Sequence, residues 1–228
     1  MPEEFFGSKS SRSGTPPPER GLAYFSPSGN FTKSRIKPAE YLIDKPHSGF
    51  AEAFRHLRAS IMFADIDKAA KTVAVVSSLP SEGKTSMTFC LGRMASMSGT
   101  RTIVIDGDIR LRQLTETSGV ASDAGLLEYL LGEATLADVV KKDDKTGLHI
   151  LPLSDRKHTP RDVFGCRAFD ALLLLLQQNY DLIVIDTGPI LLMAEARVVV
   201  SKVDQVVVAL AQDASQHAAR HDEGPAGF

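Results

Sequence analysis

The amino-acid sequence predicts an α/β fold in which a mostly parallel sheet carries helices on both faces, as a three-layer sandwich. Strand-like runs alternate along the chain with segments whose apolar residues recur at helical spacing. Most of these runs are apolar at every position, which is typical of strands buried on both faces of a parallel sheet. Three of the runs end in turn-forming or charged residues, and the carboxyl ends of parallel strands meet at one edge of a sheet. The sequence therefore predicts one sheet with a polar site along one edge.

The expected elements follow from caps, breakers and apolar spacing. Ser48 is a suitable N-cap for a first helix, in which Phe50 and Phe54 begin a buried stripe. Gly99 ends a later helix, and Thr135 is a suitable cap for another. We expect helices at about 49–64, 84–98, 125–132, 135–142, 161–179 and 192–202, and strands at about 72–77, 101–106, 148–153, 181–186 and 205–210.

The composition favours a single domain. The chain has 228 residues, of which 43% are hydrophobic, and a net charge of −2. This near-neutral charge gives no reason to expect nucleic acid as a partner. The two cysteines, Cys90 and Cys166, lack metal-ligand spacing, and free cysteines fit a reducing cytoplasm. No apolar run approaches the roughly 18 residues of a membrane helix, and no signal peptide is recognisable, so we expect a soluble chain.

Two tails flank the expected domain. Residues 1–46 are rich in Ser, Gly and Pro and have few periodic apolar residues, which predicts a disordered tail. Their modest basic excess is typical of a solvated linker or of weak docking to an anionic membrane or a partner. Residues 47–210 form the expected domain, and the short polar segment 211–228 again predicts disorder.

The segment 73–86 has the order that holds a polyphosphate: an apolar strand, a turn, and a helix beginning near Lys84. Backbone N–H groups of such a loop converge on phosphate oxygens, and the helix dipole favours their charge. Lys84 would reach the terminal phosphates, and the Thr85 hydroxyl would ligate Mg²⁺. Ser78 stands where the consensus G-x-x-x-x-G-K-[ST] has its first glycine, so a chance loop is the alternative. The candidate nucleotide-binding residues are Ser78, Pro80, Ser81, Glu82, Gly83, Lys84, Thr85 and Ser86.

Aspartates close two other expected strands. Asp106 ends the strand at 101–106, with Asp108 just beyond it, and Asp186 ends the strand at 181–186. A carboxylate there can hold Mg²⁺, directly or through water, or accept a proton from a hydroxyl that attacks the γ-phosphate. A strand-end turn or helix cap is the alternative for either aspartate alone. Together with the phosphate loop, the aspartates favour phosphoryl transfer or a nucleotide-driven switch.

A polar helix face offers two interpretations. Glu52, Arg55 and Arg58 are spaced three apart and therefore share one side of the helix at 49–64. One interpretation is a solvent-exposed face with a weak Glu52–Arg55 pair. The other is a contact with a partner.

These motifs resemble those of the bacterial tyrosine kinases of exopolysaccharide and capsule assembly, a P-loop NTPase-type family with a second acidic motif. Residues 77–85 match the Walker A motif of that family, Ser78 included. Residues 103–110 match its Walker A′ motif, an apolar run followed by Asp-x-Asp-x-Arg, and residues 182–189 match its Walker B motif. The spacing Glu-x-x-Arg-x-x-Arg on the helix face matches its subunit-contact motif. The resemblance covers roughly residues 45–210 and favours the partner interpretation of that face.

The resemblance implies an ATP-dependent kinase that phosphorylates tyrosines, largely on neighbouring copies of itself in a ring-shaped oligomer. Lys84 then neutralises phosphate charge and acts in catalysis with Asp106 and Asp108. Thr85, Asp106, Asp108 and Asp186 complete the Mg²⁺ shell, directly or through water. Asp106 and Asp108 are equal candidates for the base toward the tyrosine hydroxyl.

The resemblance also implies partners and a location. The partners are a membrane-anchored polysaccharide co-polymerase, a chain-length regulator whose cytoplasmic segment activates the kinase, and a tyrosine phosphatase. The implied location is cytoplasmic, at the inner face of the plasma membrane through the co-polymerase.

The chain departs from this family in two respects. The family usually ends in a tyrosine-rich tail, whereas the four tyrosines here are unclustered. The family also continues past the strand at 205–210 with elements that form the base side of the pocket. Without them, an exposed sheet edge at 205–210 would be a liability unless a partner covers it. One alternative is therefore a non-catalytic or ATPase-only subunit of the polysaccharide assembly complex. Another is a partitioning or septum-positioning ATPase, although Leu79 occupies the place of the signature lysine of that class.

Overall fold

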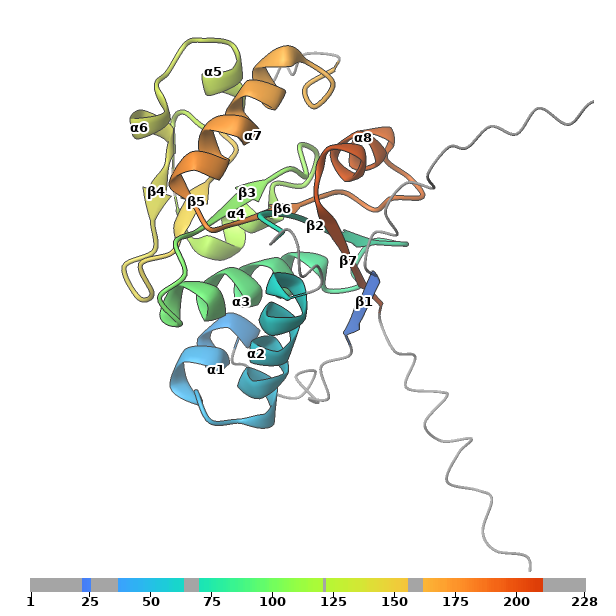
Figure 1. Ribbon diagram of the computed structural model, residues 1–228. Coiled ribbons are helices and arrows are strands. Elements are labelled where there is room, and N and C mark those ends of the chain that lie inside the picture. The colour runs from blue at the N-terminus through green and yellow to red at the C-terminus, as the bar shows by residue number, and fades with distance from the viewer. Residues whose placement is uncertain (1–21, 26–36, 64–69, 121, 156–161, 211–228) are drawn as a thin grey trace, which may run out of the picture.

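A seven-stranded sheet forms the centre of the molecule, with the strand order β1-β7-β2-β6-β3-β5-β4 (Figure 1). The computed structural model describes residues 22–25, 37–63, 70–120, 122–155 and 162–210. All neighbouring strands pair in parallel except β4 and β5. The strands are β1 (Leu22–Phe25), β2 (Thr72–Ser77), β3 (Thr102–Asp106), β4 (Lys141–Lys142), β5 (His149–Leu151), β6 (Leu182–Asp186) and β7 (Gln205–Ala209).

Helices cover both faces of this sheet, which confirms the predicted three-layer sandwich. Helices α1 to α3 lie on one face and helices α5 to α8 on the other (Figure 1). Within the described ranges, every helix is too short or too polar to cross a lipid bilayer. The helices are α1 (Pro38–Asp44), α2 (Gly49–Met62), α3 (Lys84–Met97), α4 (Gln113–Ser118), α5 (Leu126–Leu130), α6 (Leu136–Val139), α7 (Arg167–Asn179) and α8 (Ala194–Lys202).

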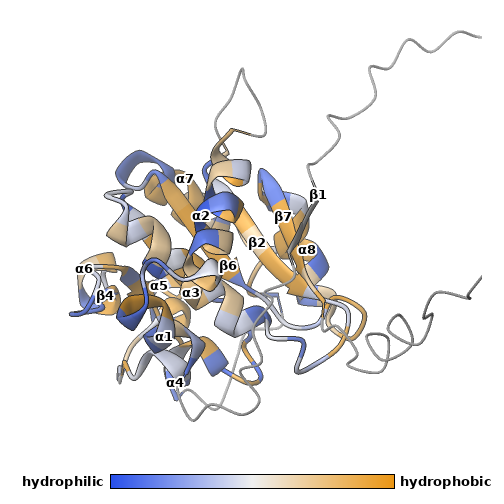
Figure 2. Ribbon diagram, turned by 90° about the horizontal axis from the view of Figure 1, so that it is seen from below, coloured by the Kyte–Doolittle hydropathy of each residue, from blue (hydrophilic) through white to orange (hydrophobic). Residues whose placement is uncertain are grey.

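The central strands are apolar at nearly every position because each face of the sheet buries its own set of side chains. In β2, Val73 and Val75 join the core beneath α2 and α3, whereas Ala74 and Val76 join the core beneath α7 and α8. Figure 2 shows β2 and β7 in apolar colours between more polar helices. Burying one such valine contributes about 1.5–3 kcal/mol. The apolar runs that predicted parallel strands are confirmed at β2, β3, β6 and β7.

The structure differs from the prediction near the start of the chain. Residues 1–46, for which the sequence predicts a disordered tail, contain β1 and α1. Helix α1 is ordered by tertiary contacts: Arg93 Nη1 of α3 donates to Ala39 O and pairs with Glu40 Oε1, both at 2.9 Å. Composition within the segment does not reveal these contacts. The rest of 1–36 and the tail 211–228 lie outside the described residues, and the limits of the domain stay a prediction.

The sheet edge at 205–210 is covered within the chain itself, because β1 pairs in parallel with β7 from Leu22 opposite Val206 to Phe25 opposite Ala209. The N-terminal segment thus supplies the strand that covers β7.

Two helix boundaries and one helix differ from the prediction. Lys141–Lys142 form strand β4 rather than the end of a helix. Helix α7 begins only at Arg167, because Asp162 Oδ1 captures the backbone N–H of Gly165 at 2.8 Å in a local turn. Helix α4 was not predicted, because its six residues are too few for a periodic apolar pattern.

Candidate active site

The loop after β2 is shaped to bind an anion. Ser81 (φ 65°) and Gly83 (φ 82°) both adopt the left-handed conformation, and Gly83 is the N-cap of α3. Within the loop, Ser77 Oγ donates to Leu79 O at 2.8 Å, and Glu82 Oε2 accepts from Leu79 N at 2.7 Å. Left-handed residues at a helix N-terminus form a concave set of backbone N–H donors. This geometry suits a phosphate.

The first turn of α3 carries two side chains that join the loop to neighbouring strand ends. Lys84, which is 5% exposed, extends its Nζ to within 3.1 Å of Asp108 Oδ2. The Thr85 hydroxyl donates to Asp186 Oδ2 at 2.7 Å. The structure thus brings together side chains that follow β2, β3 and β6, as expected for the carboxyl edge of one parallel sheet.

The two aspartates after β3 differ in their surroundings. Asp106 accepts three hydrogen bonds: from Asp108 N at 3.2 Å on Oδ1, and from Thr115 N at 2.9 Å and Thr115 Oγ1 at 2.6 Å on Oδ2. Asp108 instead uses Oδ2 for Lys84 and Oδ1 for Leu111 N at 3.2 Å. Sequence reasoning missed Thr115, because an ordinary threonine in an unpredicted short helix gives no signal.

Gly107 keeps the ends of β3 and β6 in contact. Its N–H donates to Asp186 O at 2.8 Å, and a Cβ on Gly107 would lie 2.5 Å from that same oxygen. Any larger residue would therefore push apart the two strand ends that carry Asp106 and Asp186.

The electrostatics of the site favour a bound cation. Asp106, Asp108 and Asp186 are all buried, and Lys84 is the buried cation beside them. Burial raises the pKa of Asp106 to about 6. It raises the pKa of Asp186 to about 7, although the charge of Lys84 opposes the shift. Carboxylates held in excess over cations fit a divalent ion.

The donor set suits Mg²⁺ that keeps other oxygen ligands. Among the described residues, no three His, Cys, Asp or Glu side chains gather closely enough to hold a metal alone. Mg²⁺ commonly takes one or two carboxylates and completes its shell with water and phosphate oxygens. The Thr85 hydroxyl and the Asp186 carboxylate, which touch each other, are therefore a suitable protein contribution.

The remaining predicted loop residues form the rim of the site. Pro80 and Ser81 are exposed, Ser78 and Ser86 are half-buried, and Glu82 is turned back onto the loop. Ser78, Pro80, Ser81 and Glu82 belong to the loop between β2 and α3, and Ser86 lies in the first turn of α3.

The predicted contact face on α2 is separate from this cluster. Arg55 pairs with Glu52 Oε2 and donates to Pro46 O, both at 2.6 Å. Arg58 Nη1 donates to Thr100 Oγ1 at 3.2 Å, so this side chain is partly engaged within the chain. Among the described residues, Arg58 Nε is buried without a hydrogen-bond partner.

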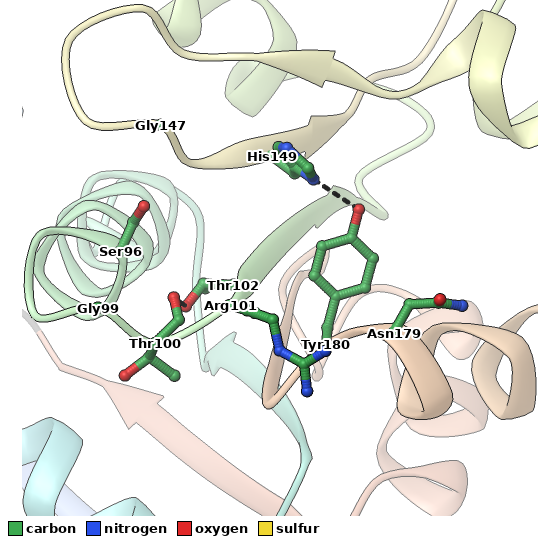
Figure 3. A pocket seen from close by; sticks show the side chains of 9 residues that line it. All are labelled: Ser96, Gly99, Thr100, Arg101, Thr102, Gly147, His149, Asn179 and Tyr180. Atoms are coloured by element: carbon green, nitrogen blue, oxygen red, sulfur yellow. Dashed lines mark hydrogen bonds between the residues drawn. The ribbon is translucent and has the colours of Figure 1, made fainter.

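Apart from this candidate site, a hollow of about 410 Å³ lies at the opposite, amino-terminal ends of the strands (Figure 3). Tyr180 points toward His149 there, with 2.7 Å between its hydroxyl and His149 Nδ1. Burial lowers the pKa of His149, and Arg101 is paired with Asp181 at 2.6 Å. No predicted site residue lines this hollow.

The phosphate loop, its lysine and threonine, and the aspartates on adjacent strands define the class of P-loop nucleotide-binding proteins. A family model described as an AAA domain matches residues 70–219. The putative tyrosine-protein kinase CapB of Staphylococcus aureus is 29% identical over 166 residues, which cover 73% of this chain and 72% of CapB. The succinoglycan biosynthesis transport protein ExoP of Rhizobium meliloti is 31% identical over 159 residues, which cover 68% of this chain and 20% of ExoP.

Solved structures agree with these relatives. The kinase domain of the Escherichia coli tyrosine kinase ETK superimposes with a TM-score of 0.69 at 25% identity, covering 81% of this chain and 74% of that one. The chain belongs to the AAA domain family and, within it, to the bacterial tyrosine kinases of capsule and exopolysaccharide biosynthesis. It spans most of CapB but only about a fifth of ExoP.

Proposed function

We propose that this chain is an ATP-dependent protein-tyrosine kinase that regulates the polymerisation and export of an exopolysaccharide or capsular polysaccharide. The observation that carries the proposal is the buried contact of 3.1 Å between Lys84 and Asp108, one from the phosphate loop and one from the end of β3. The similarity to CapB and to the kinase domain of ETK, both named as tyrosine kinases, supports tyrosine phosphorylation as the reaction.

The contact suggests how a nucleotide engages the site. The loop N–H groups bind the phosphates, and Lys84 turns from Asp108 toward them, since a phosphate is the more highly charged partner. Asp108 then loses its cation and is free to accept the proton of a tyrosine hydroxyl. Asp106, whose two oxygens already accept three hydrogen bonds, instead holds the turn in place. We therefore assign the base to Asp108.

We propose Mg-ATP as the phosphoryl donor. Thr85 and Asp186 would hold the ion, with Asp106 and Asp108 acting on it through water. Mg²⁺ on the phosphates neutralises charge that develops on the transferred group. The remaining loop residues, from Ser78 to Ser86, enclose the phosphates.

The partners proposed for the chain follow from the family. Copies of the chain would assemble in a ring through Glu52, Arg55 and Arg58. A membrane-anchored co-polymerase would activate the kinase and bring it to the inner face of the plasma membrane, and a tyrosine phosphatase would reverse the modification. The relative ExoP is described as a succinoglycan biosynthesis transport protein, which supports the proposal that this chain acts together with a polysaccharide export system.

The proposal is tested with Lys84→Met in the full chain, incubated with Mg-ATP and a separate tyrosine-rich acceptor protein. Loss of the lysine should lower phosphotyrosine formation at least about a hundredfold, the usual scale for one electrostatic contact to a transferring group. Lys142→Met, at an exposed lysine of β4, is the matched control and should retain activity.

Equal phosphotyrosine in the wild type and Lys84→Met would contradict the proposal. ATP hydrolysis by the wild type without tyrosine phosphorylation would instead support the ATPase-only alternative.

A further inference from the structure

A cavity of about 790 Å³ adjoins the candidate active site. Its wall comes from α4 and the turn that precedes it, from the chain leading into α5, and from the residues that follow β5. Neither the phosphate loop nor the Mg²⁺ ligands of the proposed function line it, so it is a separate compartment at the same edge of the sheet.

Two wall residues of this cavity are bonded to the two aspartates after β3. Thr115 donates its N–H and its hydroxyl to Asp106 Oδ2, at 2.9 and 2.6 Å. Arg112 donates its N–H to Asp108 O at 2.8 Å. The cavity wall is therefore bonded directly to the turn that carries both aspartates, through the carboxylate of Asp106 and the main-chain oxygen of Asp108.

The strand order determines on which side of the phosphate loop the cavity lies. The phosphate loop follows β2, and β6, β3 and β5 succeed one another on one side of it, whereas β7 lies on the other. The aspartates after β3 thus stand between the loop and the cavity, which lies at the end of β5. Phosphoryl transfer requires the attacking oxygen to approach roughly in line with, and opposite to, the leaving group.

The wall is held in a fixed shape. Arg112 has φ 48°, a left-handed conformation that is unfavourable for a non-glycine residue. Its guanidinium donates to Ser154 O at 2.8 Å and pairs with Asp155, both also in the wall. Glu128 Oε1 accepts from Ser154 Oγ at 2.7 Å behind that contact. Strain of this kind persists where surrounding contacts over-determine it, and it clusters at functional sites.

The charges around the cavity are unbalanced. Arg112 is the one cation in its wall among the described residues, and Asp155 already pairs with it. Glu116 and Asp123 are exposed at the wall, and Glu128 lies buried behind them. The cavity therefore offers negative charge to whatever enters it.

We propose that this cavity receives the acceptor of the kinase: a peptide segment whose tyrosine is flanked by lysine or arginine. The inference rests on the proposed function. In the transfer step, the phenolic oxygen forms a bond to the γ-phosphorus, the bond from that phosphorus to the bridging oxygen of ADP breaks, and the phenolic proton passes to Asp108. Glu116 and Asp123 hold the flanking cations and so select the acceptor.

The test compares two synthetic peptides that differ only beside one tyrosine, with lysines in the first and glutamates in the second. Wild-type protein with Mg-ATP should phosphorylate the lysine peptide with about tenfold higher kcat/KM, most of it in KM, since exposed charge pairs each contribute modestly. The double variant Glu116→Gln, Asp123→Asn should bring the two peptides within about twofold. Asp144→Asn, an exposed aspartate in the β4–β5 hairpin, should leave the preference unchanged.

Binding of the fluorescently labelled lysine peptide, in the presence of a non-hydrolysable ATP analogue, is measured alongside. Equal use of both peptides, or an unchanged preference in the double variant, would overturn the cavity assignment while the kinase proposal stands. Peptide binding that the double variant weakens, without phosphotyrosine in any sample, would support the cavity and overturn the kinase. Nucleotide affinity should be the same in wild type and double variant, which separates an effect on the acceptor from one on ATP.

Discussion

At Asp186, a carboxyl group is buried where its charged form is poorly solvated. Its pKa of about 7 in the folded chain lies above its ordinary value of 3.8. Between these two pH values the folded state keeps a proton that the unfolded state has released. Stability therefore falls as pH rises through that window, and no further change comes from this group above about pH 7. The unliganded protein should thus be more stable near pH 5 than near pH 7.5.

Asp186→Asn should remove much of this pH dependence and stabilise the unliganded protein at pH 7.5 by up to about 4 kcal/mol, since the pKa is raised from 3.8 to about 7 and one pKa unit corresponds to about 1.4 kcal/mol. Thermal unfolding of both proteins in EDTA at several pH values measures this difference in stability. Asp181→Asn is the control, because Arg101 lowers the pKa of Asp181 and the charged form is the stabilising one. If Asp186→Asn is less stable than wild type at pH 7.5, the hydrogen bonds of the Asp186 carboxylate contribute more to stability than the burial of its charge costs.

At the scale of single residues, the sequence predicted those whose chemical role follows from their amino-acid type and their spacing in a motif. Lys84, Thr85 and Asp186 were predicted to lie at one edge of the sheet, and they do so because a loop motif and apolar strands fix their positions. Thr115 and Arg112 were not, because they act through contacts with Asp106 and Ser154 that only the folded chain creates. The proposal of Asp108 rather than Asp106 as the base likewise depends on their hydrogen-bond partners, which only the folded chain shows.

At the scale of elements, β1 is the strand on which the edge of the sheet depends. Without it, β7 would present unpaired backbone groups next to Val206 and Val207. Edges of that kind template the addition of another chain.

Removal of residues 1–25 should therefore cause concentration-dependent self-association, measured by light scattering, together with a lower melting temperature. Removal of residues 1–20 leaves β1 in place and should have little effect. Identical scattering from the two shortened chains would show that the pairing of β1 with β7 contributes nothing in solution.

Long apolar runs predicted the central strands and long helices well, because burial on two faces leaves a continuous pattern. The short elements β1, α1 and α4 were not predicted from the sequence for a physical reason. They are ordered by partners distant in sequence, such as Arg93 for α1. Lys141–Lys142 could pair with β5 although lysine is a poor strand former, because side-chain placement at a sheet edge leaves the charges in water.

At the scale of the whole molecule, the α2 face is the region proposed to join copies of the chain. Arg55 is about one-third exposed and already pairs with Glu52, and Arg58 reaches Thr100 across to the α3–β3 connection. A partner subunit would have to compete for these two arginines or use their remaining donors.

Arg55→Ala combined with Arg58→Ala should lower the particle mass in multi-angle light scattering, since interface arginines often contribute 2 kcal/mol or more. Thr100→Ala is the matched control: it removes the internal contact of Arg58 but keeps both charges, so the mass should stay that of wild type. A double variant with unchanged mass would exclude this face as the interface.

The pairing of distant segments sets when the molecule can fold. Thr85 and Asp186, joined by one hydrogen bond, are separated by 101 residues along the chain. The central strand β2 (Thr72–Ser77) pairs with β6 (Leu182–Asp186) and β7 (Gln205–Ala209), which follow it only much later along the chain, and β1 also pairs with β7. Contacts between such remote segments slow folding. On the ribosome, the earliest strands must therefore remain unpaired until almost the whole domain has emerged, a period in which chaperone protection matters most.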